Sequence, residues 1–348
     1  MRRLLALLLA VPLLAAPLSA VPLPAGAAPD PDLHIESVTL NKTSVAVSGL
    51  NTAPVTVTVT GSYATGRPDD SDAPVNVILE RTGGAGQADR LISTDLVRNK
   101  AAGTWSGPLH VPSTANGTFK VTGVMTGPFF PPSPPMTDPT PYAGPSITVT
   151  GTHQPKITAL VTPKVVPFNS PYTIRWAVTD AQTGKPYGSR LRVFLGTDSG
   201  CVEYFGGRST HLTDTNGVVT KAYPGGSWMP ITCLLLPGNP TANGWLSFVP
   251  ARPAIVSAAP SKTSAPVGTV VPVNGSVAGA PYKCPVHLQR LYGASQWRTV
   301  SSGAVRQSGR FTVSAQPAYR GLIPYRVYFP ACRSYVAGAG KTFYIRGT

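Results

Sequence analysis

The C-terminal stretch Cys284–Thr348 constrains the fold most strongly, because apolar and polar residues alternate along its short runs. In Tyr325–Phe329, large apolar residues occupy every second position, and Phe343–Arg346 follows the same pattern. Each run ends at a cluster of glycine, proline or serine. A period of two with turn residues between the runs is typical of short β-strands.

Two earlier parts of the chain repeat this plan, so the sequence predicts three similar units. Each copy opens with an apolar run leading to a lysine, and these lysines, Lys42, Lys164 and Lys262, lie 122 and 98 residues apart. Each copy then has a glycine turn followed by an alternating run that stops at proline: Gly103–Pro112, Gly217–Pro224 and Gly309–Pro317. Each closes with another alternating run: Ser146–Thr150, Trp245–Val249 and Phe343–Arg346. About 100 residues with about seven short strands is the size of a β-sandwich.

The composition supports an all-β chain. The 38 prolines and 35 glycines interrupt nearly every run, and no apolar stripe with helical spacing persists beyond the N-terminus. Long helices are therefore excluded. Asn216 and Gly217 lie between two extended runs, which predicts a β-hairpin at this point.

Several short motifs resemble the immunoglobulin-like repeats of secreted actinomycete proteins. The third copy carries Val286–Arg290, Gln296–Val300, Ser308–Phe311 and Tyr325–Pro330; the second carries Thr179–Pro186 and Thr213–Gly217; the first carries Gly103–Trp105 and Ala115–Thr118. The resemblance implies three tandem immunoglobulin-like β-sandwiches, at residues 30–150, 155–251 and 252–348. Short proline-containing linkers, Gly151–Pro155 and Val249–Pro253, would separate them. Domains of this class serve adhesion, spacing and ligand binding alike, so the resemblance does not choose a function.

The N-terminus has the pattern of a secretory signal peptide. Two arginines precede the apolar run Leu4–Ala20, and small residues follow it. We expect residues 1–27 to be removed, with cleavage after Ala20 or Ala28 as alternatives. The apolar run is short and contains prolines, which disfavours a membrane anchor. The mature protein is therefore expected to be secreted, either extracellular or associated with the cell envelope.

Four cysteines in an exported chain indicate disulfide bonds. They are Cys201, Cys233, Cys284 and Cys332. Their spacing matches no compact metal site. Of the three pairings, the simplest keeps each bridge within one copy, Cys201–Cys233 and Cys284–Cys332. Each bridge would stabilise the fold by roughly 3–4 kcal/mol through loop closure.

Charge is distributed very unevenly along the chain. Residues 30–150 carry seven Lys/Arg and ten Asp/Glu. Residues 151–251 carry eight Lys/Arg and four Asp/Glu. Residues 252–348 carry twelve Lys/Arg and no acidic residue. A surface of one sign attracts polyanions such as an anionic cell-wall polymer or an acidic polysaccharide. The alternative is that the positive charge only keeps this part of the chain soluble. Sequence-specific nucleic-acid binding is not expected.

Strand alternation places a candidate binding surface in the third copy. The resemblance implies that three of its runs are neighbouring strands C, F and G of one sheet. Tyr325, Val327, Phe329, Phe343 and Ile345 would then face the core. The residues expected to face outward, and to contact a polyanion, are His287, Gln289, Arg326, Tyr328, Tyr344 and Arg346. These Arg and Tyr side chains would otherwise only stabilise the sheet through cross-strand pairs.

No catalytic motif, metal site or cofactor site is evident, and we expect a non-catalytic protein. Asp69, Asp70 and Asp72 are weak candidates for calcium, because they lack the ligand number of a dedicated loop. A hydrolase in the first copy is the alternative function, and it requires residues to converge: Asp69, Asp70, Asp72, Asp89, Asp95 and His110. Asp180 and Asp214 are expected to cap turns.

The proline-rich insertion at residues 127–145 is the other candidate contact. Its proline density favours an exposed polyproline II loop, and Phe129, Phe130 and Tyr142 are candidates for recognition. The alternatives are that these aromatic residues fold back onto the sandwich, or that the whole protein is a spacer or protein-interaction module that uses this loop. The oligomeric state and the ligand are not readable from the sequence.

Overall fold

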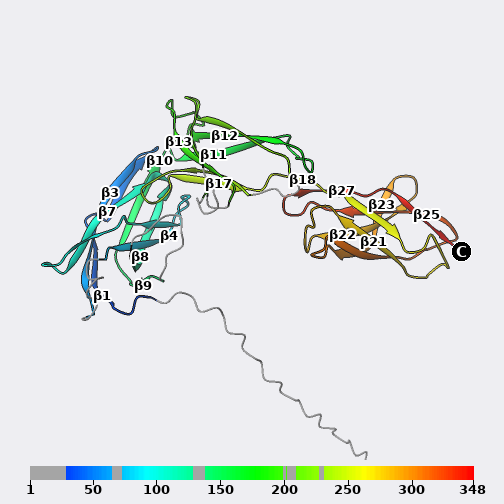
Figure 1. Cartoon of the computed structure of the whole chain (residues 1–348), viewed down its shortest axis with the longest axis horizontal. Helices are drawn as coiled ribbons and strands as arrows, with labels where there is room; N and C mark the ends of the chain where they lie inside the picture. Colours follow the sequence, from blue (N-terminus) through cyan, green and yellow to red (C-terminus); the bar gives the residue numbers. More distant parts are fainter. Residues whose placement is uncertain (1–28, 65–72, 128–137, 199–200, 202–208, 227–230) are drawn as a thin grey trace, which may run out of the picture.

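The computed structural model describes residues 29–64, 73–127, 138–198, 201, 209–226 and 231–348. The described chain is almost entirely β-structure, with one short 3-10 turn at Ser113–Ala115. Its strands build immunoglobulin-like sandwiches around three separate hydrophobic cores. We call β1–β10 the first unit, β11–β17 the second unit and β18–β28 the third unit (Figure 1).

The first unit has two sheets with a core between them. One sheet has the order β1-β3-β7-β6 and the other β2-β10-β8-β4-β5, with β9 paired to β8. The strands are β1 (Leu33–Leu40), β2 (Ser44–Ser48), β3 (Thr52–Tyr63), β4 (Val75–Gly83), β5 (Arg90–Ile92), β6 (Val97–Asn99), β7 (Thr104–Pro112), β8 (Gly117–Thr126), β9 (Thr140–Pro141) and β10 (Ser146–Thr152). Alternate side chains of β3 point into the core, where Trp105 and Phe119 are fully buried.

The second unit is smaller and has the sheets β11-β12-β15 and β14-β13-β16-β17. Its strands are β11 (Pro155–Thr162), β12 (Tyr172–Asp180), β13 (Arg192–Gly196), β14 (Ser209–Leu212), β15 (Val218–Tyr223), β16 (Thr232–Leu236) and β17 (Gly244–Phe248). Trp176 is fully buried at the centre of its core.

The third unit pairs the sheet β19-β21-β24 with the sheet β20-β28-β25-β22-β23. Its strands are β18 (Arg252–Pro253), β19 (Val256–Pro260), β20 (Ser264–Ala265), β21 (Val271–Val277), β22 (Pro285–Tyr292), β23 (Gln296–Ala304), β24 (Arg310–Ala315), β25 (Gly321–Phe329), β26 (Tyr335–Val336), β27 (Gly338–Ala339) and β28 (Phe343–Gly347). Parallel pairing of β20 with β28, and of β2 with β10 in the first unit, gives both units the split first strand of immunoglobulin-like sandwiches.

Corresponding runs of the three sequence copies form strands at corresponding places in the sheets. The runs after the glycine turns form β7, β15 and β24, and each pairs with the second long strand of its unit. The closing runs form β10, β17 and β28, which pair with β8, β16 and β25, respectively. Corresponding runs therefore share one antiparallel neighbour in each unit, although β10 and β28 also pair with β2 and β20 and, in the described part of the chain, β17 pairs only with β16.

The predicted hairpin at Asn216–Gly217 is wrong. A tight turn is present, because the Gly217 amide donates to the Asp214 carbonyl over 3.0 Å. The strands on either side, β14 and β15, belong to different sheets. The chain crosses from one layer of the sandwich to the other here, so local turn chemistry did not predict the pairing partner.

Strands extend into both predicted linker segments. β10 continues to Thr152 and β11 begins at Pro155, which leaves only His153 and Gln154 between them. At the second junction Arg252 is buried, its strand β18 pairs with β26, and its guanidinium lies 4.5 Å from the Phe168 ring of the second unit. The second junction is therefore fixed by specific contacts on both sides. Among the described residues, no helix is long and apolar enough to cross a membrane.

Candidate functional site

The third unit carries the predicted outward residues on one sheet. β25 lies between β22 and β28, so the implied order of strands C, F and G is present. Tyr325, Val327, Phe329 and Ile345 are fully buried, and Phe343 packs against the same core. Their neighbours in sequence therefore point to the opposite side of the sheet.

This opposite side, which we call the outer face, comprises seven residues: His287, Gln289, Trp297, Arg326, Tyr328, Tyr344 and Arg346. His287 pairs with Tyr328 and Gln289 with Arg326 across β22 and β25. Tyr344 and Arg346 pair with Pro324 and Leu322 of β25. Arg326 is thus a diagonal neighbour of Tyr344, and the side chains follow one another across the sheet.

Arg326 is held in place without being neutralised. Its Nε donates to the Gln289 side-chain oxygen over 2.9 Å, and its guanidinium carbon lies 4.3 Å from the centre of the Trp297 ring. Its two terminal nitrogens have no hydrogen-bond partner in the part of the chain that the structure describes. The arrangement orients a fork of donors that fits a carboxylate or phosphate.

Sequence reasoning missed Trp297. The residue lies on β23, opposite Leu291 of β22. The run Gln296–Val300 was identified as a strand, but its partner strand and its register were not. The pairing of β22 with β23 places Trp297 on the outer face, where its ring lies 4.3 Å from the Arg326 guanidinium carbon.

Tyr344 and Arg346 of the outer face are exposed, whereas His287 and Tyr328 are half-buried. Tyr344 is 54% exposed and Leu322, beside Arg346, is 57% exposed. His287 Nδ1 lies 2.8 Å from the Ser302 hydroxyl. Exposed aromatic rings beside cations offer stacking surfaces and charge together, which suits a charged chain containing flat or cyclic units.

The alternative sites in the first unit are only partly described. Asp69, Asp70, Asp72, Phe129 and Phe130 lie outside the described residues. Tyr142 packs against the core of the first unit rather than extending as a free recognition residue. This packing arises because β9 pairs with β8 and carries the chain back onto the sandwich.

The remaining hydrolase candidates of the first unit have separate partners. Asp89 Oδ1 lies 3.8 Å from Arg81 Nε, and Asp95 accepts a hydrogen bond from Asn76 over 2.9 Å. His110 lies on β7, in the sheet β1-β3-β7-β6, whereas Arg81 and Asn76 lie on β4 in the opposite sheet. Among the described residues, no group of three His, Cys, Asp or Glu side chains is arranged to hold a metal ion.

Asp180 and Asp214 cap turns, as predicted. Asp214 accepts the Val218 amide over 2.8 Å, and Asp180 accepts the Gln182 amide over 2.8 Å. Asp180 also lies 2.7 Å from His153 Nδ1 and accepts the Thr183 hydroxyl. Burial acts to raise the pKa of Asp180, but the hydrogen bonds from His153, Thr183 and Gln182 outweigh it and lower this pKa to about 2.

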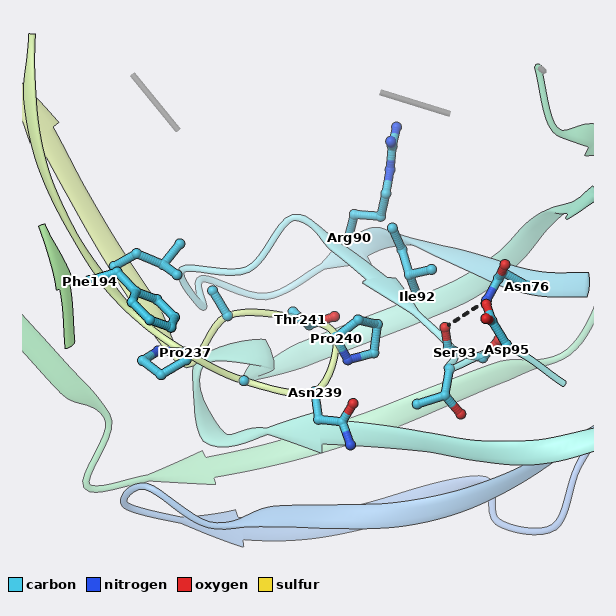
Figure 2. A pocket seen from close by; sticks show the side chains of 14 residues that line it. Asn76, Arg90, Ile92, Ser93, Asp95, Phe194, Pro237, Asn239, Pro240 and Thr241 are labelled. Carbon is cyan, nitrogen blue, oxygen red and sulfur yellow. Dashed lines mark hydrogen bonds between the residues drawn. The ribbon is translucent and has the colours of Figure 1, made fainter. Parts of the chain in front are cut away.

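A pocket of about 570 Å³ lies where the first and second units meet (Figure 2). Ile92, Ser93 and Asp95 line one side, and Phe194 and the loop 237–242 line the other. Among the described residues that line it, Arg90 is the only basic one, and it is paired with Glu80 at 3.0 Å. The pocket therefore lacks the free positive charge of the third unit.

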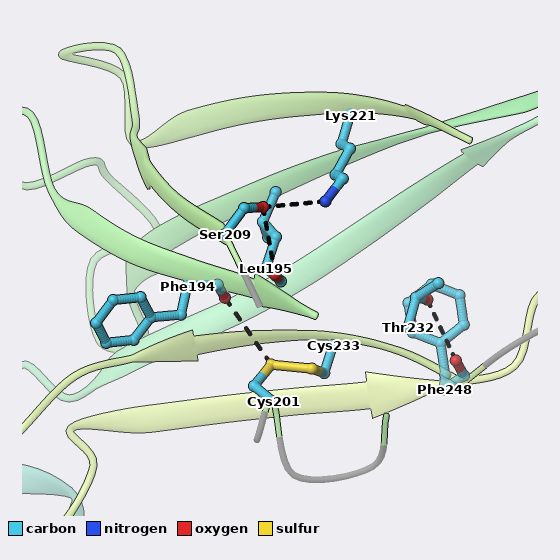
Figure 3. The surroundings of a disulfide bond; sticks show 8 residues. All are labelled: Phe194, Leu195, Cys201, Ser209, Lys221, Thr232, Cys233 and Phe248. Carbon is cyan, nitrogen blue, oxygen red and sulfur yellow. Dashed lines mark hydrogen bonds between the residues drawn. A yellow bond between two sulfur atoms is a disulfide. The ribbon is translucent and has the colours of Figure 1, made fainter. Parts of the chain in front are cut away.

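Both cysteine pairs form the bridges predicted as simplest, Cys201–Cys233 and Cys284–Cys332. Near the first bridge, Ser209 accepts a hydrogen bond from Lys221 over 3.0 Å (Figure 3). Ser209 Oγ also lies 2.7 Å from His211 Nε2, a nucleophile–base contact that the sequence search did not identify. Burial and the nearby Lys221 lower the pKa of His211. In the described residues no carboxylate orients this histidine, so the contact falls short of a catalytic triad.

Comparisons with known proteins give distant structural likeness only. No protein-family model and no curated protein sequence matches the chain. Among solved structures, it resembles the Yersinia pseudotuberculosis adhesin InvE (11% identity, TM-score 0.29, 56% of this chain and 60% of that one). It also resembles the Escherichia coli adhesin FdeC (15% identity, TM-score 0.29, 91% and 99% of the two chains). The chain spans about three fifths of the Yersinia protein. The fold assignment therefore rests on the strand order itself.

Proposed function

We propose that this is a secreted, non-catalytic binding protein whose outer face in the third unit contacts an anionic polymer of the cell envelope or an acidic polysaccharide. The observation that carries the proposal is Arg326, fixed by Gln289 and Trp297 with its terminal donors unoccupied. Residues 252–348 contain no acidic side chain to compete with such a ligand.

Export is part of the proposal. Two disulfides and the N-terminal sequence pattern support an extracellular or envelope location, because disulfides persist in oxidising compartments. The proposed domains are residues 30–150, 155–251 and 252–348, and the three separate cores support this division.

The test is the double variant Arg326→Ala, Arg346→Ala, assayed on a polyphosphate and on a polyuronate at several salt concentrations. We expect the affinity to fall and the salt slope to decrease by about one to two units, because up to two charge contacts are lost. Arg306→Ala, Arg310→Ala is the matched control, since Arg310 lies on β24 in the other sheet. Absence of salt-dependent binding by the unmodified protein, or equal losses in both variants, contradicts the proposal.

A further inference from the structure

A second arginine of the third unit lies on the inner side of the same sheet. Arg290 of β22 pairs with Tyr325 of β25, and the Tyr325 side chain is fully buried. Arg290 also pairs with Arg298 of the edge strand β23. It is therefore separated from the outer face by the sheet, and it faces the gap between the two layers.

Arg290 lines a pocket of about 470 Å³ at this edge of the sandwich. Its apolar wall includes Val267, Val270 and Val300, which are 43%, 59% and 40% exposed. Ser314 and Gln316 contribute polar atoms. A concave site with exposed aliphatic groups and a charged residue among its lining is the usual form of a small-molecule site.

Among the described residues, Arg290 has no counter-charge. Its Nε is buried and has no hydrogen-bond partner in the described part of the chain. The guanidinium lies 4.4 Å from the Tyr292 ring and donates to the Tyr292 hydroxyl, and Arg298 lies 4.9 Å from the same ring. Burial raises the pKa of Tyr325 although Arg290 acts to lower it, so this tyrosine stays neutral at pH 7. Two cations beside one ring, in a segment without acidic residues, leave the site electrostatically incomplete.

We propose that this pocket binds a small organic carboxylate with an aliphatic body. The carboxylate pairs with Arg290, and the aliphatic part lies on Val267, Val270 and Val300. An unpaired, partly buried cation is costly, and a bound carboxylate removes that cost through charge-assisted hydrogen bonds. The inference is separate from the proposed polymer binding, because it uses the other side of the sheet and a pocket rather than an open face.

The experiment titrates the full protein with N-acetyl-leucine, hexanoate and N-acetyl-leucinamide, and follows the amide signals of Val267, Val270 and Val300 by NMR. We expect saturable shifts with one or both acids and at least tenfold weaker binding of the amide, which lacks the charge. The tighter of the two acids identifies the source as a peptide C-terminus or a free aliphatic acid.

Two variants and two control variants test the assignment to Arg290. Arg290→Gln should weaken binding of the acids at least tenfold, whereas Arg310→Gln and Arg326→Ala should leave it unchanged. Val270→Glu places a competing carboxylate on an exposed residue of the pocket and should also abolish binding without affecting folding. No saturable binding of either acid by the unmodified protein, equal binding of acid and amide, or full binding by Val270→Glu would each overturn the proposal.

Discussion

The first and third units share a strand plan but differ in what their arginines contact. In the first unit, Arg81 and Arg90 lie beside the carboxylates of Asp89 and Glu80, at 3.8 Å and 3.0 Å. In the third unit, Arg326 contacts Gln289 and Trp297. Arg298 donates to the Gln296 side chain over 2.7 Å and 3.1 Å, and Arg306 to the Thr312 hydroxyl over 3.3 Å.

This difference shows how one scaffold serves two electrostatic roles. A carboxylate beside an arginine fixes its position and cancels its field, whereas an amide oxygen or an aromatic ring fixes its position and leaves the charge available. The positive charge of the third unit is thus oriented but not neutralised. In the first unit this cancellation applies to Arg81 and Arg90, whereas Arg98 lies 3.6 Å from the Trp105 ring and donates to the Gly61 carbonyl over 3.0 Å.

The disulfides provide the largest expected difference between the units. The double variant Cys284→Ala, Cys332→Ala should destabilise the third unit by about 4 kcal/mol, because its bridge closes a loop of 48 residues. The double variant Cys201→Ala, Cys233→Ala should destabilise the second unit by slightly less, because its bridge closes a shorter loop of 32 residues. The first unit contains no cysteine and should be unaffected. Hydrogen exchange resolved by residue under denaturant checks this. Loss of protection in the first unit would show that its stability depends on its neighbours.

Converting the third unit to the pairing of the first unit tests the role of its free charge. Gln289→Glu places a carboxylate beside Arg326 Nε, where the present contact is 2.9 Å. We expect polyanion affinity to fall about tenfold. The free energy of unfolding should change by less than about 1 kcal/mol, as it does for other surface ion pairs. Gln296→Glu beside Arg298 is the matched control away from the outer face. Equal loss in both variants would mean that only net charge matters.

Alternation explains why much of this comparison could be predicted from the sequence. The inward and outward sets of β25 and β28 follow from a period of two, and the domain-local cysteine pairs follow from the repeat. Trp297 could not be placed, because the pairing of β22 with β23 shifts register between Leu288 and Gln289. The chain crosses from one sheet to the other between β14 and β15, and the pocket beside Arg290 lies between two sheets. Both features depend on which sheets pack against each other, and a local sequence pattern does not contain that information.

Acid should distinguish the second unit from the third. The pKa of Asp180 is lowered from 3.8 to about 2 in the folded protein, so the ionised form stabilises the fold. This stabilisation is complete above pH 3.8 and is lost as the pH falls through about 2. The third unit contains no Asp or Glu and should show almost no change over this range. NMR signals of both units followed from pH 5 to about pH 2 test the difference. Asp180→Asn should remove this pH dependence of the second unit's stability, whereas Asp214→Asn, at an exposed position, should leave it in place.

The smallest expected effect comes from freeing an arginine of the first unit. Glu80→Gln removes the carboxylate 3.0 Å from Arg90, and both side chains are about half exposed. Because solvent screens such a pair, the free energy of unfolding should change by about 0.5 kcal/mol or less. A free charge without an aromatic support should also add little polyanion affinity, less than about threefold. Denaturant unfolding and salt-dependent binding measure the two quantities. A gain comparable to the loss in Gln289→Glu would mean that release of a cation alone, without the Trp297 platform, is enough for binding.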